Sequence, residues 1–259
     1  MKKILLAGAA LALIAAPALA ADLPQRTYAK TPVYVPPPVY NWTGFYFGGH
    51  VGGGWANQGS TELAPGTAAF PTGSAFTKNN LSGFLGGVQG GFNWQASNLV
   101  VGVEGEYSWA DVSGSATTAS PVLPGFTSNV TAKDKDYALA TGRLGYAADN
   151  WLFFAKGGGA WAQSSSTGTG LLASGAVFDT TSASATRSGW VVGAGVEWGF
   201  APNWSAKLEY NHIDLGNTNV SVVSTATGVS NVSSSSTVEV VKAGVNYRFN
   251  WGSPVVAKY

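Results

Sequence analysis

The chain of 259 residues has no cysteine, only 2 histidines and few charged side chains. Without cysteine there is no disulfide framework and no thiolate chemistry, and so few histidines argue against a histidine-based metal cluster. Charged residues make up 10% of the chain and the formal net charge is +1, which gives no electrostatic basis for binding nucleic acid. The 35 glycines and 10 tryptophans suit neither a disordered chain nor a soluble helical domain.

Long apolar runs are scarce as well, and the one clear case is at the N-terminus. Lys2 and Lys3 precede the apolar residues 4–16, and small residues follow. This pattern predicts a signal peptide over residues 1–20 that is cleaved between Ala20 and Ala21. A retained membrane anchor is the alternative, but the apolar run is too short to cross a bilayer comfortably. We therefore expect an exported protein.

Residues 21–41 are rich in proline, valine and tyrosine. Proline lacks the backbone donor that a β-ladder needs and favours an extended polyproline conformation. We expect a periplasmic linker without a packed fold. It could be a plain spacer or a partner-binding segment, and it could hang free or enter the domain that follows.

From Trp42 onward the apolar residues alternate with small and polar ones at a period of two. In residues 99–111, every second side chain from Leu99 to Trp109 is apolar, aromatic or glycine, whereas Glu104 and Glu106 lie on the opposite face. Alternate residues of a strand point to opposite sides of a sheet, so the pattern predicts strands. The predicted strands cover about 44–56, 82–94, 99–111, 136–146, 151–162, 189–200, 203–213 and 237–249.

The connections between these strands are of two kinds. Residues 95–98, 147–150 and 201–203 are short and rich in turn formers, whereas 57–80, 111–135, 163–187 and 214–236 are long and rich in Ser, Thr, Gly and Ala. Short periplasmic turns that alternate with long outer loops are typical of outer-membrane barrels and not of soluble sandwiches. The predicted fold is all-β, an eight-stranded antiparallel transmembrane β-barrel with meander topology over residues 42–251, followed by a tail at 252–259.

The charged residues within the strands support this fold. The mid-strand charges fall on the face opposite the apolar one, whereas Glu239 and His212 fall on the outward face near the outer strand ends. Both faces of 151–162 are apolar, and the register chosen for this strand is the one that turns Lys156 inward. A lysine or arginine that faced lipid at mid-membrane would cost roughly 2–4 kcal/mol. We expect a salt-bridged network in the barrel interior, with an ion pathway as the alternative, formed by Glu104, Glu106, Arg143, Lys156, Glu197, Lys207, Glu209, Lys242 and Arg248.

The tryptophans lie at or beside the ends of the predicted strands. In outer-membrane barrels, such rings form aromatic girdles at the two membrane interfaces. The predicted girdle comprises Trp42, Trp55, Trp94, Trp109, Trp151, Trp161, Trp190, Trp198 and Trp204.

No catalytic, cofactor or metal site is predicted. His50 and His212 are the only imidazoles available as a base. The period-two alternation of their strands places His50 inside the barrel and His212 outside. The Gly-x-Ser-x-Gly elbow of hydrolases is absent from the sequence. The glycine runs lack the context of a phosphate loop and fit the curvature of a small closed barrel instead. We expect that the protein is not an enzyme.

Four segments resemble one family of proteins. The sequence WTGFYFGG at 42–49, together with 189–198, 204–210 and 241–249, is similar to the small porin-like outer-membrane β-barrel surface proteins of alphaproteobacteria, of the rhizobial and brucella type. More distantly, the chain resembles the transmembrane barrel of OmpA. The resemblance implies insertion by the barrel-assembly machinery, which reads an aromatic end of the last strand, here Phe249 or Tyr259. The resemblance also implies that His50 is a candidate ligand of haem.

Three functions remain open from the sequence. The first is a surface protein of the cell outer membrane that supports the envelope and displays its loops. The second is a channel for small solutes. This function is favoured by the small inward residues Gly48, Gly52, Gly87 and Gly102. The third is an adhesin or a ligand-binding surface protein. The expected partners are outer-membrane lipid, periplasmic chaperones and the assembly machinery, with host, phage or solute ligands at the loops.

Overall fold

A computed structural model of the chain describes residues 40–249, with the exception of 65 and 227. The predicted signal peptide with its cleavage site at Ala20 and Ala21, most of the linker, and the tail with Tyr259 lie outside the described residues.

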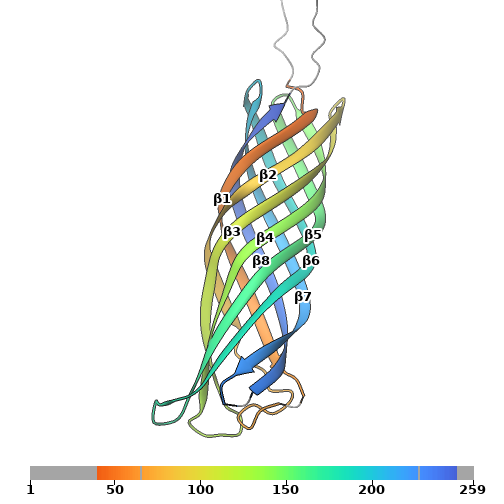
Figure 1. The fold of residues 1–259 in the computed structure, drawn as a ribbon. Helices are drawn as coiled ribbons and strands as arrows, with labels where there is room; N and C mark the ends of the chain where they lie inside the picture. Colours follow the sequence, from red (N-terminus) through yellow and green to blue (C-terminus); the bar gives the residue numbers. More distant parts are fainter. Residues whose placement is uncertain (1–39, 65, 227, 250–259) are drawn as a thin grey trace, which may run out of the picture. The chain divides into compact units, whose positions relative to one another are not determined.

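The described residues form eight antiparallel strands that close into one barrel, and each strand pairs with its neighbours in the sequence. The first and last strands pair with each other, for example Phe45 with Phe249, so the sheet has no free edge. Figure 1 shows the strands tilted around the barrel. The predicted fold class and meander topology are confirmed. The strands are β1 (Gly44–Glu62), β2 (Asn79–Ala96), β3 (Leu99–Ala119), β4 (Thr127–Ala148), β5 (Trp151–Leu171), β6 (Val177–Ala201), β7 (Trp204–Ser224) and β8 (Gly228–Phe249).

One end of the barrel, which we call the turn end, is closed by two-residue turns. These turns are 97–98, 149–150 and 202–203. Ser97 and Asp149 adopt φ values of 56° and 53°, a backbone conformation typical of the tight turns that join twisted antiparallel strands. The opposite end, the loop end, lies at the bottom of Figure 1 and holds the connections 63–78, 120–126, 172–176 and 225–227.

The strands are much longer than predicted, and three of the four predicted long loops are wrong. Most of 111–135, 163–187 and 214–236 is strand, and only the connection between β1 and β2 stays long. The Ser- and Thr-rich composition suggested loops, but these residues still alternate at a period of two. Beyond the membrane, water can solvate polar side chains on the outside of a sheet, so a strand can continue there without an apolar face.

The outside of the barrel carries an apolar belt. Eight exposed tryptophans from the predicted girdle border it in two groups. The group nearer the loop end comprises Trp55, Trp109, Trp161 and Trp190, and the group nearer the turn end comprises Trp94, Trp151, Trp198 and Trp204. Between them, exposed side chains such as Val51 and Leu208 face outward, as expected of a surface that contacts acyl chains.

Trp42 does not belong to this girdle, so that part of the prediction is wrong. Its side chain is only 1% exposed and packs inside the turn end against Val100 and Leu152. Trp42 precedes β1, and its position is therefore not bound to the alternation of the strand. Its backbone N–H donates to Gln95 Oε1 at 2.7 Å, which helps to hold the segment across the barrel opening.

The belt can be tested with two valines of similar exposure at different heights. Val51 is 69% exposed between the two tryptophan groups, and Val229 is 62% exposed near the loop end. We expect Val51→Lys to destabilise the barrel by roughly 2–4 kcal/mol in a bilayer, and Val229→Lys by about 0–1 kcal/mol. Denaturant unfolding of protein folded into lipid vesicles measures both. Equal effects would contradict the position of the belt.

Candidate functional site

All nine charged residues of the predicted interior network lie inside the barrel and are buried. Six of them meet in one cluster, which we call the ion cage, made of Glu104, Glu106, Lys156, Lys207, Glu209 and Lys242. They come from β3, β5, β7 and β8, which lie on different sides of the closed sheet. The cage therefore crosses the lumen instead of following one wall.

Two lysines each contact all three carboxylates of the cage. Lys156 Nζ lies 3.2 Å from Glu104, 2.9 Å from Glu106 and 2.6 Å from Glu209. Lys207 Nζ lies 3.1 Å, 3.1 Å and 3.2 Å from the same three residues. Lys242 adds contacts to Glu106 and, at 3.3 Å, to Glu209. Because opposite charges alternate at such short distances, the attraction offsets the loss of hydration on burial.

A second buried ion pair extends the cage towards the turn end. Arg143 Nη2 lies 2.9 Å from Glu197 Oε2, and Arg143 Nη1 lies 3.7 Å from Glu104. Ser205 and Asn246 donate to the other oxygen of Glu197 at 2.5 Å and 2.9 Å. With this pair included, the network holds four cations and four carboxylates, so its formal charge is zero.

Arg248 was expected in the same network, and that expectation is wrong. Its guanidinium lies 4.2 Å from the centroid of the Tyr40 ring and 5.0 Å from that of Trp42, and it donates to the backbone oxygen of Asn41 at 2.5 Å. Among the described residues no carboxylate pairs with it. Stacking on aromatic rings stabilises this cation instead, and it helps to seat the segment before β1 in the turn end.

The three glutamates of the cage are close enough together to suggest a metal site. Oxygens of Glu104, Glu106 and Glu209 lie within 4.8 Å of one another. Each of these carboxylates already contacts at least two lysine ammonium groups. A divalent cation would have to displace those ammonium groups, so the donor set fits an internal salt-bridge network better than a metal.

Polar side chains lie close beside the inward glycines. A Cβ at Gly48 would lie 2.2 Å from Asn246 Oδ1, and one at Gly52 would lie 2.8 Å from Lys242 Cβ. At Gly87 it would lie 2.8 Å from His50 Nε2, and at Gly102 it would lie 2.3 Å from Asn93 Oδ1. Neighbouring polar side chains occupy the space beside these glycines. The glycines therefore allow dense packing of polar side chains in the lumen, and they do not by themselves support the channel that the sequence suggested.

His50 is held within this packing. Its Nδ1 contacts Gln89 Oε1, and its Nε2 lies 2.8 Å from Ser108 Oγ. The other histidine, His212, faces outward and lies 2.7 Å from Glu239, next to Trp190. Both nitrogens of the His50 ring already have protein partners, which does not fit a ligand of haem iron.

An apolar layer covers the ion cage on its loop-end side. Residues from all eight strands form it, so apolar side chains meet across the lumen at this level. Its members are Ala56, Leu81, Leu85, Val112, Ala132, Tyr137, Leu139, Ala160, Ala162, Val191, Ile213, Leu215, Val238 and Val240.

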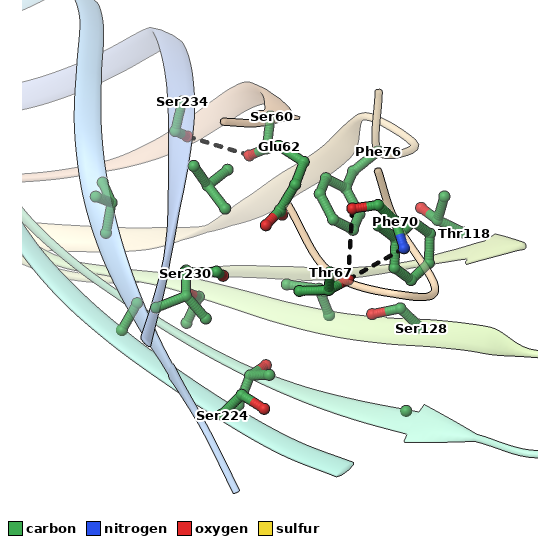
Figure 2. Close-up of a pocket in the computed structure, with 18 of the residues that line it drawn as sticks. Ser60, Glu62, Thr67, Phe70, Phe76, Thr118, Ser128, Ser224, Ser230 and Ser234 are labelled. Atoms are coloured by element: carbon green, nitrogen blue, oxygen red, sulfur yellow. Dashed lines mark hydrogen bonds between the residues drawn. The ribbon is translucent and has the colours of Figure 1, made fainter. Parts of the chain in front are cut away.

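Beyond this layer, the interior opens into a cavity at the loop end, which we call the chamber, with a volume of about 360 Å³. Its walls are the extended parts of the strands, and the β1–β2 connection folds over it (Figure 2). Phe70 packs against Phe76 and Phe126 with ring centroids 4.9 Å and 6.1 Å apart. Cavities of this size in proteins accommodate small molecules.

The polar side chains of the chamber were missed from the sequence. Glu62, Asn79 and Arg187 line it and are buried, although 57–80 and 163–187 were expected to be loops. The available signal was the alternation before Arg187, where residues 179, 181, 183 and 185 share its inward face. Burial raises the pKa of the Glu62 carboxyl above its ordinary value.

The balance of charge in the cage can be tested by removing one partner. Glu209→Gln leaves three lysines against two carboxylates in the cage, and we expect a loss of about 3–5 kcal/mol of unfolding free energy. The control is Asp111→Asn, which breaks the exposed pair with Lys133 at 2.8 Å and should cost at most about 1 kcal/mol.

A double variant distinguishes the energy of ion pairing in the cage from the cost of burying each charge. Lys242→Met added to Glu209→Gln restores neutrality in the cage, so the double variant should be more stable than the sum of the single effects predicts. Strict additivity in denaturant unfolding would show that the ion pairs are not coupled.

Comparison with known proteins agrees with this architecture. Residues 6–249 match the model of the outer membrane protein beta-barrel domain family. The chain is 31% identical to the 31 kDa outer-membrane immunogenic protein of Brucella melitensis over 96% of this chain and 100% of the relative. It is 28% identical to the 25 kDa outer-membrane immunogenic protein of Brucella abortus over 96% of this chain and 99% of the relative.

A shorter match extends to the rhizobia. The chain is 30% identical to the 22 kDa outer membrane protein of Rhizobium leguminosarum over 68% of this chain and 66% of the relative. The resemblance expected from the four sequence segments is thereby confirmed. The chain belongs to the outer membrane protein beta-barrel domain family, and it is an outer-membrane protein similar to the Brucella immunogenic proteins.

Proposed function

We propose that the protein is a closed membrane anchor that supports the cell envelope and presents its loop end at the cell surface. In this role it neither conducts solutes nor catalyses a reaction. The structural work is done by the belt and the ion cage, and contact with the outside is made by the extended strands and the chamber.

One observation carries the proposal: buried side chains from different sides of the barrel meet across the lumen at three successive levels. Going from the turn end, the aromatic cluster around Trp42, the ion cage and the apolar layer follow one another along the barrel axis. An ion that crossed the barrel would have to break the contacts of the lysines with their carboxylates and then enter a layer of mainly apolar side chains.

The proposed orientation places the turn end in the periplasm and the loop end outside. Outer-membrane barrels have short periplasmic turns and longer outer connections, and the two-residue turns here all lie at one end. Phe249 ends β8 at that same end with its ring exposed, and we propose that the assembly machinery reads this aromatic strand end.

The absence of catalysis is proposed from the two histidines. His50 is enclosed between Gln89 and Ser108 in the packed lumen, where a substrate has no access. His212 contacts Glu239 on the outer face of the barrel, and Tyr210 donates to the same carboxylate. Neither imidazole contacts a nucleophile that borders the chamber, so the described residues offer no imidazole base for hydrolysis there.

A planar bilayer tests closure directly. We expect the purified, folded protein to insert without discrete conductance steps, because the ion cage and the apolar layer both block the lumen. A large porin reconstituted in the same way serves as the positive control. Reproducible single-channel steps that depend on protein concentration would overturn the closed-anchor proposal.

The role in the envelope calls for a cellular test. A deletion strain should become more sensitive to detergent, and the wild-type chain should restore resistance. The Val51→Lys variant, which disturbs the belt, should restore it less well than Val229→Lys, provided that both are compared at measured outer-membrane levels. A deletion strain with unchanged detergent sensitivity would argue strongly against envelope support.

A further inference from the structure

We propose that the chamber binds a small uncharged sugar unit. This inference goes beyond the anchor role and does not depend on it, because binding can be measured on the purified protein. The source of the sugar could be a free solute or the end of a glycan chain, which share the same chemistry.

The first support is a buried carboxylate that points into the chamber. Glu62 is only 3% exposed, and its Oε1 makes no hydrogen bond to any described residue. Figure 2 shows its oxygens in the open space between Phe76 on one side and Ser234 on the other. A buried acceptor without a partner costs free energy, and a ligand hydroxyl would satisfy it.

Two further atoms at the chamber lack a partner. Asn79 Oδ1 is a second unpaired acceptor, and Arg187 Nε is an unpaired donor, in both cases within the described part of the chain. The other nitrogens of Arg187 donate to Ser234, with Nη2 2.8 Å from its hydroxyl, so the guanidinium is fixed in place. A ligand that both donates and accepts hydrogen bonds fits this set, and a hydroxyl group does both.

The rest of the lining divides into an aromatic side and a hydroxyl side. Phe70 and Phe76, near the rings of Phe126 and Phe178, face a wall that carries Ser230 and Ser234 (Figure 2). Sugars have an apolar C–H face that packs on an aromatic ring and hydroxyls around their edge. Serine and threonine hydroxyls can donate or accept as such a ligand requires.

The charges in and below the chamber disfavour an anionic ligand. Glu62, Asp179 and Arg187 line it, and Asp134 lies beneath it, bonded to Ser164 and Tyr137. An anionic ligand would approach three carboxylates. An ammonium group could not accept the hydrogen bond that Arg187 Nε offers, whereas a hydroxyl group both donates and accepts. A neutral sugar meets both conditions, so we expect it to bind better than a uronic acid or an amino sugar.

The hydrogen bonds of the β1–β2 connection fix the roof that such a ligand needs. The backbone N–H of Phe76 donates to Ser60 O at 2.9 Å, and that of Thr77 donates to Thr118 Oγ1 at 2.8 Å. Ser120 Oγ donates to Ala69 O at 2.5 Å, which ties the roof to the neighbouring connection. A preformed roof lowers the entropy that binding would cost.

The test is a titration of the detergent-solubilised full chain with neutral monosaccharides, followed by saturation-transfer NMR. The panel also holds a uronic acid and an amino sugar of the same ring type. We expect at least one neutral sugar to bind, and to bind better than its charged counterparts. If no neutral sugar binds up to about 10 mM, or if a charged counterpart binds better, the proposal is overturned.

Variants locate the binding in the chamber. Glu62→Ala and Phe70→Ala should each weaken binding about tenfold, the effect of losing one polar or one aromatic contact. Ala183→Phe, which fills the chamber without removing a polar group, should abolish it. Asp111→Asn, an exposed carboxylate outside the chamber, should leave binding unchanged.

Folding of each variant is checked by circular dichroism and by the migration of the unheated barrel on a detergent gel. Binding that survives Ala183→Phe in folded protein would place the sugar elsewhere and overturn the assignment. An oligosaccharide that binds as tightly as its terminal monosaccharide would indicate a glycan end, and binding of the monosaccharide alone would indicate a free solute. Both results support the proposal and separate the two sources.

Discussion

Hydrocarbon offers no hydrogen-bond partner to a backbone amide, and the rest of this structure depends on that constraint. Every N–H and C=O of a membrane-spanning strand needs a neighbouring strand, so the sheet has to close, and β1 pairs with β8 to close it. Closure divides the side chains into those that meet lipid and those that fill the lumen. A one-residue shift would move Lys156 or Lys207 into acyl chains, so the register is strongly determined.

The lumen that results is narrow, and this protein fills it with charge. Six ionised side chains in direct contact would be costly in a dry interior if any one lacked a partner. Here three lysines and three glutamates alternate around a common centre, and Arg143 with Glu197 continues the pattern. Gly52 makes room for one of these long side chains, because a Cβ at this position would lie 2.8 Å from Lys242 Cβ.

Outside the membrane the constraint is relaxed, and the same sheet takes a different form. The strands continue far beyond the loop-side tryptophans with serine, threonine and alanine on both faces. The interior no longer has to be packed with ion pairs, and a chamber with unpaired polar atoms such as Glu62 Oε1 and Arg187 Nε becomes possible. A rigid barrel thus carries an open compartment on a closed base.

The sequence by itself determined the strand count, the meander order and which charges face inward, because period-two alternation is a local property of the chain. It did not determine where strands end outside the membrane, since serine and threonine are compatible with both loops and solvated strands. Nor did it determine the partners of the inward cations. Arg248 and Lys207 both point inward, but Arg248 stacks on Tyr40 and Lys207 joins the cage. Trp42 and the chamber depend on contacts between residues far apart in the chain. Only the closed tertiary structure brings Glu62, Asn79 and Arg187 to one cavity, because each lies on a different strand and no local pattern links their heights along the barrel.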